Sequence, residues 1–184
     1  MSVVSMALAA WMAIAQAGMP KQKLTVVVQG AATVRPIVLF EAQEMTTRMF
    51  ARIGITLNWR TGAPRGESAL PIVMSFATQT PEMLHPGALA YALPYEGVHV
   101  TVFADRVQNS LLPRTILAHV MVHEITHLVE GVDRHSDTGV MKARWTGKDY
   151  ACMRTAPLAF DLEDILLIRA GLSKRGGAAS AQVR

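Results

Sequence analysis

The stretch from His123 to Met141, HEITHLVEGVDRHSDTGVM, constrains this chain more than any other part of its sequence. It opens with an HExxH motif in which His123 and His127 lie four residues apart. On a helix this spacing places both imidazoles on one face, where they can reach a single metal ion. Glu124 follows the first histidine, in the position of a general base that activates a zinc-bound water. The motif therefore predicts a zinc site suited to hydrolysis.

The residues before the motif predict that it lies within a buried helix. The run from Leu111 to Val122, LLPRTILAHVMV, is apolar and compatible with a helix. Ser110 and Pro113 are typical of a helix start, and Gly131 is typical of a helix end. Both histidines and the glutamate are therefore expected on one well-delimited helix.

A catalytic zinc needs a third protein ligand, which must come from the segment that folds back after the helix. The candidates in sequence are Glu130, Asp133, His135 and Asp137. Glu130 is the weakest of them, because on the helix its side chain points away from the two histidines. We predict His135 as the third ligand, since histidine is the commoner zinc ligand, and keep Asp133 as the alternative.

Several other residues invite a functional interpretation that their context does not support. His119 shares the helix face of the motif, but a fourth histidine would close the open position that catalysis needs, so we expect a buried supporting role. His85 and His99 are expected to be structural or solvent-facing. Tyr150 could donate a hydrogen bond to an oxyanion, although the spacing does not demand it. Cys152 is the single cysteine, which excludes an intramolecular disulfide, and we expect it to be buried.

Length and apolar content predict one folded domain, since the chain has 184 residues and is 51% hydrophobic. A loop is expected at Thr61–Ser68, and helices at Ile37–Ile53 and Leu158–Ala170 flank the motif in sequence. Five further segments are rich in β-branched or apolar residues and read as strands, namely Lys23–Gln29, Ile55–Arg60, Leu70–Thr78, Ala88–Leu93 and Val98–Ala104.

The motif segment resembles the metzincin clan of zinc metallopeptidases, whose signature is HExxHxxGxxH followed by a methionine turn. The first part of the signature is matched by His123, Glu124 and His127. The pair His135-Ser136 followed by Gly139-Val140-Met141 is similar to the matrixin-like version.

The spacing after the motif differs from this signature. Gly131 lies four residues after His127, and His135 lies eight residues after it. Asp133 stands at the spacing of the family's third ligand, an arrangement that resembles snapalysin-like enzymes. Both His135 and Asp133 therefore stay open as the third ligand.

The resemblance implies an α+β, zincin-like fold. We expect a mixed, twisted sheet of about four or five strands packed on two helices, with a small C-terminal helical subdomain. Ala88–Leu93 would form an antiparallel edge strand above the cleft, either binding an extended peptide or serving only as half of a hairpin. Met141 would form an apolar floor under the histidines.

The resemblance also implies a secreted zinc-dependent endopeptidase, in which Glu124 takes a proton from zinc-bound water and delivers it to the leaving amine. The alternative is a noncatalytic exported binding protein with a structural zinc site. Glu124 favours the enzyme, because a structural site has no use for a general base.

The termini and the charge pattern complete these expectations. Residues 1–17 read as a cleaved secretory signal peptide ending in Ala-Gln-Ala, which predicts a secreted or periplasmic protein without stable membrane association. The alternative is an uncleaved anchor, although the apolar run is shorter than the roughly 20 residues that span a bilayer. Residues 18–172 would form the catalytic domain, and 173–184 a disordered basic tail. No basic run is interleaved with aromatic residues, so we expect no nucleic-acid partner. The family resemblance implies a peptide or protein substrate, and we expect a monomer.

Overall fold

The computed structural model describes residues 22–64, 70–84 and 87–181. The predicted signal peptide at 1–17 and His85 lie outside the described residues. Half of the loop expected at Thr61–Ser68, residues 65–68, also lies outside them.

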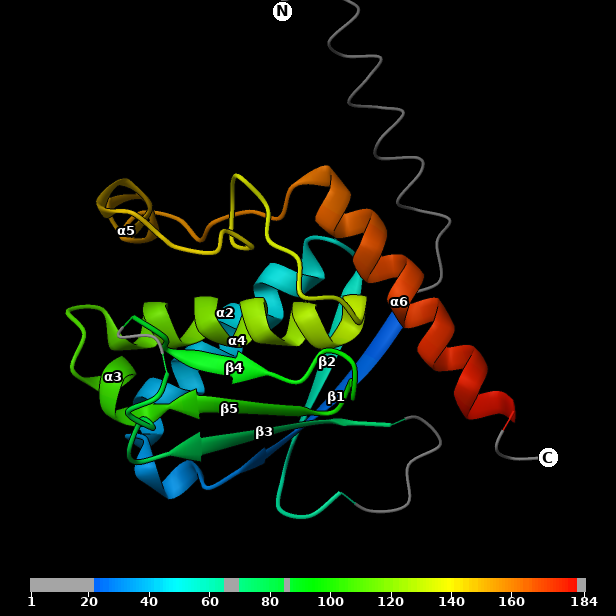
Figure 1. Ribbon diagram of the computed structural model, residues 1–184, viewed down its shortest axis with the longest axis horizontal. Helices are drawn as coiled ribbons and strands as arrows, with labels where there is room; N and C mark the ends of the chain where they lie inside the picture. Colours follow the sequence, from blue (N-terminus) through cyan, green and yellow to red (C-terminus); the bar gives the residue numbers. More distant parts are fainter. Residues whose placement is uncertain (1–21, 65–69, 85–86, 182–184) are drawn as a thin grey trace, which may run out of the picture.

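A mixed sheet forms the base of the molecule (Figure 1). Its strands follow the order β2-β1-β3-β5-β4, and all neighbours are parallel except β4, which pairs antiparallel with β5 at one edge. The predicted mixed sheet with an antiparallel edge strand is thus confirmed. The strands are β1 Gln22–Gln29, β2 Ile55–Thr61, β3 Ile72–Ala77, β4 Ala90–Ala92 and β5 His99–Phe103.

Strand β1 shows why this part of the chain folds as a parallel sheet. Val26, Val27 and Val28 are all buried, so both faces of the strand are covered. Continuous β-branched residues suit such a position, because their stiff side chains pack well on a pleated surface that never meets water.

Two long helices, α2 Pro36–Ala51 and α4 Pro113–Glu130, pack against each other and against the sheet. Each begins with proline in its first turn, where the missing N–H would have had no helical partner. Helix α4 ends at Gly131, whose φ of 71° is the left-handed conformation that glycine adopts without strain. Nearly every residue of α4 is buried, because the sheet covers one side and the C-terminal segments cover the other.

The remaining elements are short, apart from the last helix. They are the 3-10 turn η1 Ala31–Thr33, helix α3 Ala104–Gln108, helix α5 Gly147–Met153 and helix α6 Leu162–Ala181. The loop after α4 and helix α5 lie on the far side of α4 from the sheet (Figure 1). None of the helices within the described residues is both long and apolar enough to cross a membrane.

The C-terminal helix corrects the prediction made for the tail. Its start at Leu162 is later than expected, and it continues to Ala181, so a disordered tail from residue 173 is wrong over most of that range. Arg175 explains the continuation: its guanidinium donates to the carbonyl oxygens of Gly97 at 2.6 Å and Leu70 at 3.0 Å. These bonds tie the second half of α6, at Arg175, to the body of the molecule.

The crossing of α6 over α4 depends on Gly171. A Cβ atom at this position would lie 1.8 Å from the carbonyl oxygen of Val129, so the two backbones touch. We expect Gly171→Ala to lower the free energy of unfolding by about 2–3 kcal/mol, because the helices must separate. Gly176→Ala on the same helix is the matched control, since nothing lies within 4 Å of its Cβ position. Urea unfolding of both variants tests this, and equal stabilities would contradict it.

Candidate metal centre

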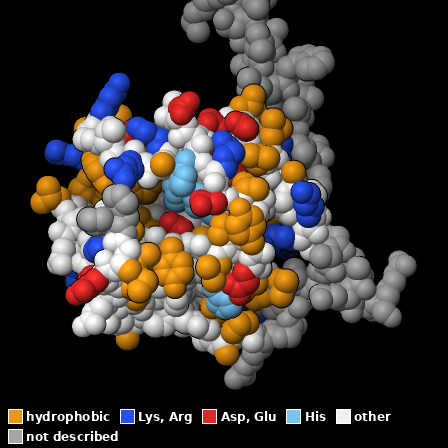
Figure 2. Space-filling model, viewed as in Figure 1, with side chains coloured by type: hydrophobic (Ala, Val, Ile, Leu, Met, Phe, Trp, Pro, Cys, Tyr) orange, Lys and Arg blue, Asp and Glu red, His pale blue; other side chains and the backbone are white. Residues whose placement is uncertain are grey.

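Three histidines converge at the surface of α4. His123 and His127 come from the helix and His135 from the loop that follows it. One ligating nitrogen of each lies within 4.8 Å of the others. Figure 2 shows pale-blue histidine side chains near the centre of this face, with a carboxylate recessed beside them. The structure therefore brings together the three histidines that the sequence singled out.

Backbone carbonyls fix the ring orientations of the two histidines on the helix. Nδ1 of His123 lies 3.0 Å from the carbonyl oxygen of Val140, and Nδ1 of His127 lies 3.2 Å from that of Val132. A carbonyl can only accept, so both Nδ1 atoms donate and both Nε2 atoms of the neutral rings present lone pairs.

The two Nε2 atoms are 3.0 Å apart. Two lone pairs at this distance repel each other unless a cation accepts both. The donor set of three imidazoles therefore fits a zinc ion, which takes three protein ligands in catalytic sites.

Burial keeps these rings neutral, as metal ligation requires. It lowers the pKa of His123 to about 3, with a further lowering from the neighbouring His127. The pKa of His127 is also lowered, first by burial and then by His135.

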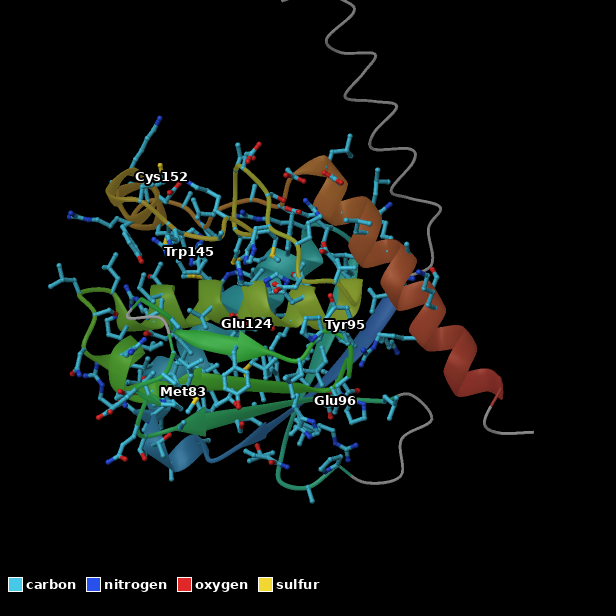
Figure 3. All side chains as sticks on the ribbon, in the orientation of Figure 1. Met83, Tyr95, Glu96, Glu124, Trp145 and Cys152 are labelled. Carbon is cyan, nitrogen blue, oxygen red and sulfur yellow. The ribbon has the colours of Figure 1, made fainter. Side chains whose placement is uncertain are left out.

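Glu124 lies on α4 beside the histidines, with only 8% of its surface exposed (Figure 3). Burial and, to a smaller extent, the charge of Asp133 raise the pKa of its carboxyl to about 8. Asp133 itself is exposed and lines the same cleft, but its carboxylate is not part of the three-nitrogen group. Glu130 and Asp137, the other candidates, are not part of it either. Both oxygens of Glu130 are instead buried without a hydrogen-bond partner among the described residues, and burial raises its pKa to about 7.

The histidines lie on the floor of a cleft of about 740 Å³. One wall is built from β4 and its flanks, and the opposite wall from the segment between Lys142 and Tyr150. Trp145 packs edge-on against His123 with ring centroids 5.9 Å apart, and its Nε1 donates to the carbonyl oxygen of Val140. Tyr150 packs edge-on against Trp145, with ring centroids 6.4 Å apart, and also lines the cleft.

A buried carboxylate holds the loop that carries His135. Asp164 at the start of α6 is fully buried and accepts from Ser136 Oγ at 2.5 Å and from Arg134 Nη2 at 2.6 Å. These two residues flank His135 on both sides. The imidazole of His135 is exposed, and its ring packs against those of His123 and His127, with centroids 5.2 and 4.9 Å apart.

The methionine turn closes under the loop. Met141 is fully buried, and its carbonyl oxygen accepts from the Ser136 backbone N–H at 2.9 Å. Gly139 has a φ of 73°, and a Cβ there would lie 2.2 Å from the carbonyl oxygen of Ala159. The turn therefore depends on glycine both for its conformation and for its close packing.

His119 is not one of the three histidines whose nitrogens could bind a metal ion. Its Nδ1 lies 2.7 Å from the carbonyl oxygen of Thr115, and its Nε2 accepts from the Leu158 backbone N–H at 3.0 Å. Both ring nitrogens are occupied, which agrees with the buried supporting role expected for it. His99 is exposed and pairs with Glu96.

Cys152 corrects a sequence-based expectation, because it is exposed and not buried. It lies on the outer surface of α5, a short amphipathic helix that the sequence interpretation missed. The signal for α5 was present as the capping box Thr146-x-x-Asp149, in which each residue bonds the backbone of the other. The roles of Trp145 and Asp164 had no local signal, because both depend on contacts distant in sequence.

The comparisons with known proteins bear on the fold. No family model matches this chain, and no curated protein matches it. Among solved structures it is similar to archaemetzincin from Methanopyrus kandleri, with a TM-score of 0.52 and 14% sequence identity over 83% of this chain and 96% of that chain. At this identity the similarity shows the fold, and it agrees with the expected metzincin-like architecture.

The buried carboxylate generates a prediction about stability. Asp164→Asn removes the negative charge to which Arg134 and Ser136 donate hydrogen bonds, so we expect the free energy of unfolding to fall by about 2–3 kcal/mol. Glu163→Gln is the matched control, because Glu163 also faces Arg134, at 3.5 Å, but is 69% exposed. Its effect is expected to stay within about 0.5 kcal/mol. Denaturant unfolding compares the two, and a stable Asp164→Asn protein would show that the loop is held by something else.

Proposed function

We propose that the protein is a zinc-dependent endopeptidase. One observation carries the proposal: three histidine nitrogens that can bind one ion lie beside the buried Glu124 in an open cleft. His123, His127 and His135 would hold the zinc, leaving a coordination position open toward the cleft. The fold shared with an archaemetzincin supports the same reaction class.

Zinc, when bound, would polarise the peptide carbonyl and make water a stronger acid. Glu124 would accept a proton from the attacking water at its carboxylate and pass it to the nitrogen of the leaving amine as the C–N bond breaks. Its burial suits this role, because a carboxyl with a raised pKa holds a proton long enough to deliver it.

The edge strand β4 supports a peptide as substrate. It pairs with β5 on one side only, and Ala90, Tyr91 and Ala92 line the cleft. Unpaired backbone groups at such an edge can bind an extended peptide whatever its side chains. This favours the substrate-binding role of the edge over that of a simple hairpin.

The alternative is an exported binding protein in which zinc only stabilises the fold. Burying a carboxyl next to the three histidines lowers the stability of the fold, and a purely structural zinc site gains nothing from it. Glu124 therefore favours the enzyme hypothesis. Export, cleavage of residues 1–17 and a monomeric state remain part of the proposal, based on the sequence alone.

Glu124→Gln tests the reaction. We expect kcat/KM for a casein or fluorogenic peptide substrate to fall by roughly 10²–10⁴-fold, since the amide cannot accept a proton. Zinc content, measured by atomic emission, should stay at the wild-type level. Undiminished proteolysis in this variant would remove the hypothesis.

The third ligand can be tested separately from activity. His135→Ala should weaken zinc binding by at least about 100-fold, because a ligand is lost from the ion itself. Asp133→Ala is the matched control and should keep its zinc, since its carboxylate lies outside the histidine group. Competition with a chromophoric chelator measures both affinities, and the opposite pattern would assign Asp133 as the ligand.

A further inference from the structure

The two walls of the cleft differ in charge. The wall formed by Gly87–Ala92 and Pro94 carries no ionisable group except the Tyr91 phenol. The opposite wall carries Lys142 and Arg144 next to Trp145 and Tyr150. Away from the histidines, these two cations are the only charged side chains that line the cleft within the described residues.

Lys142 is held in place at this wall. Its Nζ lies 2.6 Å from Asp149 Oδ2, and both side chains are mostly covered, with 21% and 16% exposed. Asp149 is itself fixed by the backbone N–H and hydroxyl of Thr146. An ammonium has three donors, so this pairing leaves two for a bound molecule.

The rest of the segment adds positive charge. Between residues 142 and 154 the chain has four cations, Lys142, Arg144, Lys148 and Arg154, against the single anion Asp149. Figure 2 shows Lys and Arg side chains gathered around this side of the histidines. The field at this wall is therefore positive toward the cleft.

The charge of the cleft has the opposite sign on the other side of the three histidines. Asp133 lines the cleft and its charge acts on His127, where the nearby Arg134 is already paired with Asp164, whereas Trp145 packs against His123. The cleft is thus negative on the His127 side of the metal group and positive on the His123 side. A bound peptide would therefore place different residues of its own against the negative and the positive part of the cleft.

We propose that the cleft selects peptides with an acidic side chain at the residue that lies against the wall of Lys142 and Arg144. This rests on the proposed peptidase function, and it names the substrate class. A carboxylate there gains charge-assisted hydrogen bonds from an ammonium that is already ordered and from the guanidinium. The same carboxylate placed on the Asp133 side is repelled, so the preference is confined to one side of the scissile bond.

The test measures peptide binding and not turnover. Fluorescein-labelled alanine-based peptides, with a single Glu, Gln or Lys moved along the sequence, are titrated into the zinc-loaded Glu124→Gln protein. We expect Glu to bind about fivefold tighter than Gln at positions on one side only, and the difference to shrink with salt. Lys142→Gln and Arg144→Gln in the same background should each reduce it. Lys148→Gln removes an equal charge from an exposed position outside the cleft lining and should reduce it less than either of these variants.

The outcomes separate this inference from the function on which it rests. Equal binding of Glu and Gln peptides at every position, including no binding, overturns the selectivity, as does a preference that both variants leave intact. A preference for Glu in a zinc-loaded wild-type protein that hydrolyses none of the peptides supports the selectivity and overturns only the peptidase function.

Discussion

Two hydrogen bonds between backbone carbonyls and helix histidines determine what this site can be. The spacing of His123 and His127 places them on one face of α4, but spacing leaves the side-chain torsions free. The carbonyls of Val140 and Val132 remove that freedom, because each accepts from an Nδ1 and turns the Nε2 lone pair toward the same point. The helix supplies the residues, and the loop that returns over it orients them as candidate ligands of one ion.

His119 shows that position on the helix is not enough. It lies four residues before His123, as His123 lies before His127, yet both of its nitrogens are used inside the protein. It accepts the N–H of Leu158 and so fixes the chain that leads into α6. The same four-residue spacing thus gives one structural histidine and two candidate ligands. Which of these a histidine becomes depends on the hydrogen-bond partners that the rest of the chain offers its ring nitrogens.

The parts of the structure that the sequence predicted are those set by local pattern. The β-branched run of β1 and the proline and glycine that bound α4 follow from residue type and order, whereas the edge position of β4 was implied by the family resemblance. The end of α6 and the wall at Trp145 were missed, because they depend on long-range contacts such as Arg175 with the carbonyl of Gly97. The histidines were found because metal ligation needs particular residue types at particular intervals, whereas Asp164 is one carboxylate among many until the fold buries it.

The longer interval between His127 and His135 has a physical explanation in Asp164. A third ligand eight residues after the second requires a wider loop, and a wider loop loses more conformational entropy when it is ordered. Arg134 and Ser136 offset that loss by binding one buried carboxylate from both sides of His135. Asp133, two residues earlier, has no such support and remains exposed in the cleft. The wider loop is therefore held on both sides of His135, the residue proposed as the third ligand.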